Sequence, residues 1–176
     1  MRQIDINQFN DIVEQIQLKP RLKRELRFIV STEKMTQTDW DESELVAIKD
    51  RSGKQGVLLV SLDSTMYALQ YELTSGVQSS FTGRAQPIIC DFCYTWQSGT
   101  RAAVITFPKS KQNKRNSSYL CCDDLRCSDH ARSKTEAARM SRAQLREDLT
   151  DEDRIKRLMT KTARLLKTLQ VEPVTL

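Results

Sequence analysis

The five cysteines of the chain fall into two short groups. Cys90 and Cys93 are separated by two residues, Cys122 and Cys127 by four, and Cys121 directly precedes Cys122. Two cysteines in one tight turn point their sulfur atoms the same way, and two such pairs supply the four thiolates of a tetrahedral zinc site. Four sulfurs fill the coordination sphere, so the pattern predicts one structural zinc ion (Zn2+) with no open position for a reacting water. The expected ligands are Cys90, Cys93, Cys122 and Cys127.

Two neighbours complicate the second cysteine group. Cys121 and Cys122 are adjacent on a predicted strand, where successive side chains point to opposite faces, so only one of them can face the zinc. The four-residue spacing to Cys127 suits a turn between a strand end and a helix start, which favours Cys122 and leaves Cys121 for packing. His130 lies three residues beyond Cys127 and could also be a ligand. With four cysteines present, we expect it to be exposed or to cap a helix.

Other uses of these residue types are poorly supported. A redox-active C-x2-C pair belongs between the strand and the helix of a βαβ unit, and no such unit surrounds Cys90. An odd number of cysteines without a secretory signal argues against a disulfide framework. His130 is the only histidine, so a zinc protease of the HExxH type, which needs two, is excluded. The sequence has no glycine-rich phosphate loop either, and we do not expect an enzyme.

Strands are predicted on both sides of the first cysteine pair. Three apolar runs divided by turns predict an antiparallel meander: 45–48, 57–62 and 66–73. The third run could also be a short helix. A second hairpin is expected from 101–107 and 119–122, and a helix should begin at Cys127. A turn with two cysteines, a hairpin, and a helix whose first turn supplies the last ligand together describe a treble-clef zinc finger.

Helices are predicted at both ends of the chain. Helical spacing of apolar residues covers 7–18, with Asn7 as candidate N-cap, and 21–31, which follows Pro20. A polar loop then brings Trp40 onto the core. A polar helix is expected after Cys127, and Thr150 opens a last helix with an apolar stripe that should pack on the sheet or on the N-terminal helices. The stripe consists of Ile155, Leu158, Met159, Thr162, Leu165, Leu166 and Leu169.

These elements define the predicted fold class and domain organisation. The fold is α+β, with a short N-terminal helical hairpin, an antiparallel β-meander and a treble-clef four-cysteine zinc finger followed by C-terminal helices. The helical segment is expected over 1–43 and the zinc-binding domain over 44–176. No run approaches about 18 consecutive apolar residues, so a membrane span is excluded.

The charge is unevenly distributed along the chain. Residues 1–50 carry 8 Lys/Arg and 10 Asp/Glu, and the remainder carries 20 and 13. A basic C-terminal two-thirds suggests an anionic partner, either an acidic protein face or RNA. Residues 101–115 contain five bases and no acid. We expect the hairpin loop to present Lys109, Lys111, Lys114 and Arg115 to this partner.

Affinity for a partner also requires buried anchors, for which aromatic residues near the cysteines are candidates. These are Phe92, Tyr94 and Tyr119. Phe92 and Tyr94 belong to the turn around the first cysteine pair, and we expect both to be exposed. Packing in the core is the alternative role for each aromatic ring.

Several strings resemble the C-terminal treble-clef domain of the fusidic-acid-resistance (FusB-type) family, also called elongation-factor-G-binding proteins. They are Cys90-Asp-Phe-Cys93, the basic hairpin loop, and Cys122-Asp-Asp-Leu-Arg-Cys127-Ser128 after an aromatic strand. The meander and the acid-rich start of the last helix also fit, so the resemblance covers residues 45–170. The chain departs from the family in its shorter N-terminal helical segment and in Tyr119, which lies three rather than two residues before Cys122.

The resemblance implies a non-enzymatic cytoplasmic zinc protein that binds elongation factor G. Such a protein promotes release of the factor from a ribosome stalled by fusidic acid, and can give resistance to that drug. We expect a monomer without a membrane partner. The alternative is a ribosome- or rRNA-binding zinc finger that uses the same basic loop on phosphates. The acidic N-terminal third favours a protein partner over RNA.

Overall fold

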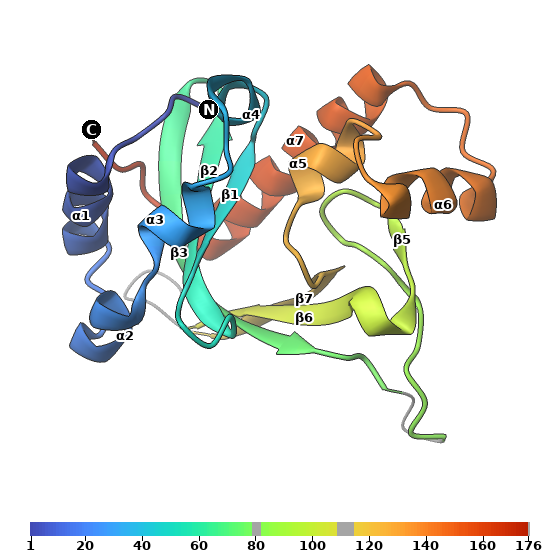
Figure 1. Ribbon diagram of the computed structural model, residues 1–176, viewed down its shortest axis with the longest axis horizontal. Helices are drawn as coiled ribbons and strands as arrows, with labels where there is room; N and C mark the ends of the chain where they lie inside the picture. The colour runs from blue at the N-terminus through green and yellow to red at the C-terminus, as the bar shows by residue number, and fades with distance from the viewer. Residues whose placement is uncertain (79–81, 109–114, 176) are drawn as a thin grey trace.

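One five-stranded antiparallel sheet, in the order β1-β2-β3-β6-β7, joins the meander to the second hairpin (Figure 1). The computed structural model describes residues 1–78, 82–108 and 115–175. Within these residues the strands of the sheet are β1 (Leu45–Lys49), β2 (Gln55–Leu62), β3 (Thr65–Ser75), β6 (Ala102–Phe107) and β7 (Ser117–Cys122). The mixed α+β class is the one that the sequence predicted.

The strand β3 is the element that the sequence left undecided. It is a strand rather than a helix, because it pairs with β2 from Gln55↔Glu72 to Leu62↔Thr65. Its last residues then pair with β6, from Glu72↔Thr106 to Ser75↔Ala103. The 11-residue length of β3 therefore connects the meander to the cysteine-bearing hairpin. Two short strands, β4 (Ile88–Ile89) and β5 (Trp96–Gln97), form a separate ladder around the first cysteine pair.

The N-terminal helices differ from the prediction in their number and ends. They are α1 (Ile6–Gln15), α2 (Pro20–Glu25), α3 (Phe28–Thr32) and α4 (Gln37–Asp41). The predicted N-cap Asn7 is wrong: the carboxylate of Asp5 accepts hydrogen bonds from the backbone N–H groups of Asn7 and Gln8 and forms a capping box. The predicted loop before Trp40 contains α4, whose capping box is made by Thr36 and Asp39.

The predicted helix over 21–31 is divided between α2 and α3. Leu26 has extended backbone angles and forms an isolated bridge with Asp50. The N–H of Arg27 donates to the carbonyl of Lys49 at 2.9 Å. These contacts with the turn after β1 replace the helical hydrogen bonds and break the helix at this point.

The polar helix expected after Cys127 is likewise two helices, α5 (Cys127–Ala131) and α6 (Glu136–Leu145). The hydroxyl of Thr135 caps α6 by accepting from the N–H of Ala138 at 3.1 Å. The last helix, α7 (Asp151–Leu169), begins after the predicted cap Thr150. Its stripe is buried at Leu158, Thr162, Leu165, Leu166 and Leu169.

The core has two parts, one on each face of the sheet. On one face, Phe9, Ile12 and Trp40 pack with Val57 and Leu59 of β2. On the other face, Leu158 and Leu165 of α7 pack with Leu58 and Val60 of the same strand and with the cysteines. Figure 1 shows α7 behind the sheet and the N-terminal helices on the opposite side. Residues from both sides of position 43 contribute to the first of these cores. The division into two domains at this position stays a prediction.

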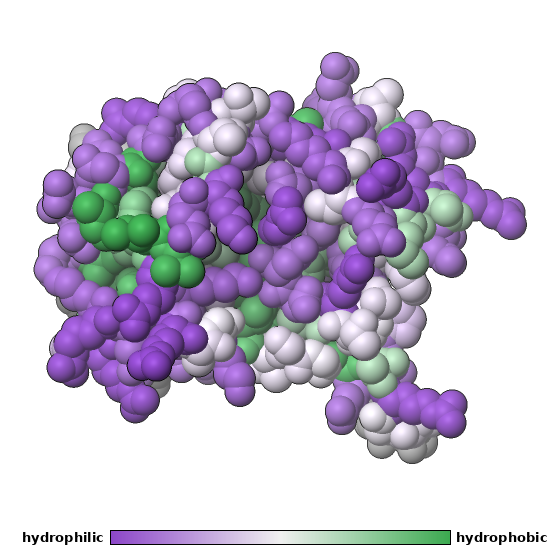
Figure 2. All heavy atoms as spheres, viewed as in Figure 1, coloured by the Kyte–Doolittle hydropathy of each residue, from purple (hydrophilic) through white to green (hydrophobic). Residues whose placement is uncertain are grey.

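Two features of the surface complete the description. On the face drawn in Figure 2, apolar side chains gather over the N-terminal helices, where Ile29 and Val30 of α3 are 67% and 64% exposed. Among the described residues, no helix combines the length and the apolar composition that a bilayer span requires.

Candidate metal centre

The first cysteine pair is held by the small β4–β5 ladder. Ile88 pairs with Gln97 and Ile89 with Trp96, so the residues between them form a closed turn. Within the turn, the N–H of Cys90 donates to the carbonyl of Thr95, and the N–H of Tyr94 donates to the carbonyl of Cys90, both at 3.0 Å. Tyr94 has a φ of 62°, which turns the chain back toward β5. This turn, residues 90–94, is called the knuckle below.

The second pair comes from the end of a strand and the start of a helix. Cys122 is the last residue of β7 and Cys127 the first residue of α5. The chain between them reverses at Leu125, which has a φ of 59° and whose N–H donates to the carbonyl of Cys122 at 3.2 Å. Knuckle, hairpin and helix thus occur in the order of a treble clef.

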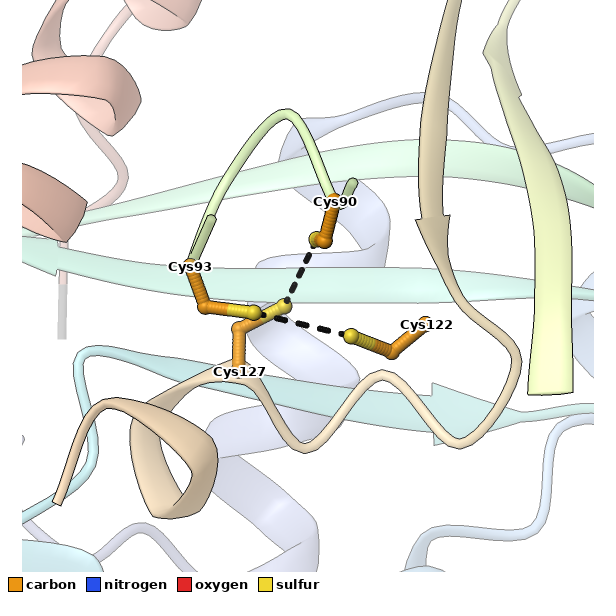
Figure 3. Close-up of side chains that lie close together, drawn as sticks. All are labelled: Cys90, Cys93, Cys122 and Cys127. Carbon is orange, nitrogen blue, oxygen red and sulfur yellow. Dashed lines mark hydrogen bonds between the residues drawn. The ribbon is translucent and has the colours of Figure 1, made fainter. Parts of the chain in front are cut away.

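The four sulfur atoms converge on one point in the core (Figure 3). All lie within 4.8 Å of one another, and each cysteine is at most 2% exposed. The sulfurs of Cys90 and Cys127 are 3.8 Å apart, and those of Cys93 and Cys122 are 3.5 Å apart. A tetrahedral zinc ion with Zn–S bonds of about 2.3 Å separates its sulfurs by about 3.8 Å. The site therefore has the donor set and the dimensions for one zinc ion.

Cys121 lies outside this cluster. It pairs with Ala103 across the hairpin and is fully buried. Burial raises the pKa of its thiol well above the usual range, so it stays protonated and apolar in character. The alternation of side chains along β7 thus directs Cys122, and not Cys121, toward the other three sulfurs.

The electrostatics of the four-cysteine cluster also favour a cation. Burial opposes ionisation of Cys90, but hydrogen bonds from the sulfhydryl groups of the other three cysteines outweigh it and lower the pKa of this thiol well below its usual range. Hydrogen bonding to Cys122 and Cys90 raises the pKa of Cys127. Thiolate charges this close together in a buried site disfavour one another, a conflict that a divalent cation removes.

Two buried side chains that the sequence did not single out lie around the cluster. Gln97 of β5 is 1% exposed, and its amide nitrogen donates to the sulfur of Cys122 at 3.1 Å. Arg154 of α7 is fully buried, with its Nε 3.4 Å from the carboxylate of Glu147, and it interacts electrostatically with Cys93. Burial lowers the pKa of Arg154. Neither residue has a local sequence signal, because both reach the site only through tertiary packing.

His130 differs from its predicted role. It is 1% exposed, so the expectation of an exposed side chain is wrong. Its Nδ1 lies 2.6 Å from the hydroxyl of Thr135, which caps α6, and its Nε2 lies 3.2 Å from Asp124. The ring is buried because it links the turn before α5 to the start of α6. His130 thus contacts Thr135, the cap residue of α6, but does not itself cap a helix as the sequence had suggested.

The aromatic candidates divide into buried and exposed rings. The expected exposure of Phe92 is wrong, since it is 4% exposed and its ring lies 6.0 Å from that of Tyr119, which packs against the core. Tyr94 is 40% exposed, as expected. Arg157 and Lys161 of α7 lie 4.6 and 5.8 Å from the centre of its ring. The knuckle therefore turns Phe92 inward and Tyr94 outward.

The basic hairpin loop is only partly described. Lys109, Lys111 and Lys114 lie outside the described residues, and Arg115 is exposed just before β7. The predicted partner surface can therefore be placed at Tyr94, Tyr119 and Arg115 only.

Comparisons with known proteins agree with this geometry. A family model described as the FBP C-terminal treble-clef zinc-finger matches residues 21–169. No curated protein and no solved structure matches the chain. The matched region contains the whole sheet, all four clustered cysteines and the complete α7 helix.

Proposed function

The chain belongs to the FBP C-terminal treble-clef zinc-finger family, that of the FusB-type fusidic-acid-resistance proteins, and on this premise we propose that it binds elongation factor G. In this proposal it is a non-enzymatic cytoplasmic monomer that promotes release of the factor from the ribosome and so protects translation from fusidic acid. The observation that carries the proposal is the family match over residues 21–169 together with the four-sulfur cluster inside it.

We propose one zinc ion as the cofactor, with a structural role. Its ligands would be the thiolates of Cys90, Cys93, Cys122 and Cys127. When bound, the ion joins the knuckle, the end of β7 and the start of α5 into one rigid unit. Four sulfur donors leave no position for a substrate, which agrees with a binding function rather than catalysis.

The partner surface proposed for elongation factor G is the exposed side of this unit. Tyr94 supplies an aromatic anchor at the tip of the knuckle, where Arg157 and Lys161 border its ring. Arg115, Tyr119 and the lysines of the hairpin loop would extend the surface toward an acidic face of the factor. Phe92 is not a contact in this proposal, because its ring is buried beneath the surface.

The experiment is a binding titration of the zinc-loaded protein with elongation factor G from the same organism. We expect a one-to-one complex, and at least a tenfold loss of affinity for Tyr94→Ala, the loss of about 1.4 kcal/mol typical of a central anchor. Ile29→Ala is the control, since it truncates an apolar residue on the N-terminal helices that is even more exposed than Tyr94. Absence of a complex with the wild-type protein would refute the function, and equal affinity of Tyr94→Ala and wild type would refute the surface.

A further inference from the structure

The solvent-facing side of α7 is unusually basic. Residues 154–171 contain six Lys/Arg and no Asp/Glu. Arg154 is buried, and the other five cations reach the surface. They are Lys156, Arg157, Lys161, Arg164 and Lys167, and are called the basic face below.

The five cations lie together because of their helical spacing. At 3.6 residues per turn, they occupy an arc of about 140° on the helix. Thr160 and Thr168 share this arc, as does Asp153 in the first turn of the helix, and all three are exposed. Leu158, Leu165 and Leu169 occupy the opposite side, where they pack against the sheet. The basic face therefore contains no apolar side chain.

Little acidic charge compensates this face. Arg157 forms an ion pair with Glu147 at 2.6 Å. Among the residues that the structure describes, no ion pair is found for the other four cations. Asp63 and Glu152 approach one edge, where they line a groove together with Lys156 and the apolar side chains of Leu62, Ile155 and Met159. The positive charge is thus directed to solvent along most of the helix.

The composition of the basic face distinguishes between classes of partner. Protein interfaces are depleted of lysine and need buried apolar or aromatic anchors. The basic face supplies none from its own residues, and Tyr94 and the apolar side chains of the groove lie only at its margins. Nucleic-acid interfaces are polar and strongly positive, and their phosphate contacts come from Lys, Arg and Thr side chains. We propose that the basic face of α7 binds the phosphate backbone of helical RNA. The choice of RNA over DNA rests on the proposed function, which places the protein at the ribosome.

This surface is adjacent to the knuckle. Arg157 and Lys161, at one margin of the basic face, are the two cations that border Tyr94. An RNA helix on α7 would therefore lie beside a protein bound at the knuckle. In this arrangement the chain contacts ribosomal RNA and elongation factor G at the same time, with Arg157 and Lys161 at the boundary between the two surfaces.

The test measures binding of a fluorescent RNA duplex as a function of salt. Four unpaired cations that each neutralise a phosphate give a slope of log affinity against log salt of about −3.6, or about a 150-fold loss of affinity between 50 and 200 mM salt. The triple variant Lys156→Gln/Arg164→Gln/Lys167→Gln should reduce the slope to about −0.9 and the loss to about 3.5-fold. Glutamine keeps the helix propensity, and Lys161 stays in place beside Tyr94.

A matched control removes three exposed cations elsewhere. The variant Lys19→Gln/Arg24→Gln/Arg27→Gln changes the net charge equally at the flanks of α2, and should retain the wild-type slope. An unchanged slope in the α7 variant, or equal reductions in both variants, would overturn the proposal. The proposal would also be overturned if the wild-type protein bound a poly-glutamate peptide but not RNA, and if the α7 variant no longer bound the peptide. That result would assign the basic face to an acidic protein partner. Elongation factor G binding by the α7 variant should equal that of wild type, which separates this test from that of the proposed function.

Discussion

Replacing Cys127 with serine should release the metal and unfold the zinc-bearing side of the molecule. Cys127 begins α5 and is 2% exposed, and its sulfur lies 3.8 Å from that of Cys90. A serine hydroxyl is a poor substitute for a thiolate in a four-sulfur zinc site. The substitution therefore removes the coordinate bond by which the proposed zinc ion joins α5 to the knuckle.

The size of the effect follows from the zinc free energy. Structural zinc sites contribute about 10–16 kcal/mol of apparent binding free energy at neutral pH, which matches or exceeds the whole stability of a typical domain. For a chain of 176 residues, a loss of 1 kcal/mol lowers the midpoint of thermal unfolding by about 3 °C. A loss of 10 kcal/mol corresponds to about 30 °C, so the zinc-bearing side should be unfolded at 37 °C.

The assay combines zinc stoichiometry with thermal unfolding followed by circular dichroism. Cys121→Ala is the matched control, because it removes a buried sulfur one residue from the cluster. We expect it to retain one zinc per chain and to lose only a few degrees. A Cys127→Ser protein that is free of zinc yet unfolds at the wild-type temperature would refute the reasoning. Loss of zinc in Cys121→Ala would show that the wrong neighbour had been assigned to the metal.

Three further predictions concern other contacts. Gln97→Leu removes the N–H group that donates to the sulfur of Cys122. It should weaken zinc affinity by about 10–100-fold in a chelator competition. Unchanged affinity would show that this hydrogen bond does not contribute to zinc binding. Burial would raise the pKa of Asp50, but hydrogen bonds from Ser52 and from backbone N–H groups outweigh burial and lower this pKa. The ionised carboxylate of Asp50 therefore stabilises the fold above the unfolded pKa of about 3.9, and this contribution is lost as the pH falls. Asp50→Asn should accordingly reduce the free energy of unfolding by about 1.5–3 kcal/mol at pH 7 and much less at pH 3 in urea titrations, and an equal reduction at both pH values would contradict this assignment. Leu158→Ala opens a cavity between α7 and the sheet and should cost about 2–5 kcal/mol by the same titration, whereas a cost below 1 kcal/mol would mean that the helix packs loosely.

The features predicted from the sequence are those with a local signal. Cysteine spacing identified the four clustered cysteines, and the four-residue spacing to Cys127 favoured Cys122 over Cys121. The Thr150 cap and the apolar stripe located α7. The basic face of α7 also has a local sequence signal, the absence of Asp and Glu over residues 154–171.

The features that the sequence missed depend on contacts between distant segments. Phe92 is buried because β7 brings Tyr119 against it. The break at Leu26 arises from a bridge to Asp50, and Gln97 reaches Cys122 only because β5 folds back on β4. Helical periodicity and local exposure rules contain none of this information.

The two-sided core indicates how far the loss of zinc should spread. β2 is buried on both faces, and its Val57 and Leu59 belong to a cluster that contains no cysteine. α5 makes polar contacts at the edge of the meander, where Ser128 accepts from the N–H groups of Glu44 and Leu45 and Arg132 pairs with Glu44 at 2.5 Å.

Removal of zinc with a chelator should therefore produce partial unfolding. Amide hydrogen exchange should accelerate in the knuckle, β6, β7 and α5, while β1, β2 and the helices packed on Val57 and Leu59 keep their protection. The boundary should lie within β3, since its first part pairs with β2 and its last four residues pair with β6. Uniform loss of protection through β1 and β2 would show instead that the metal supports both cores, and that the sheet transmits its loss across the whole chain.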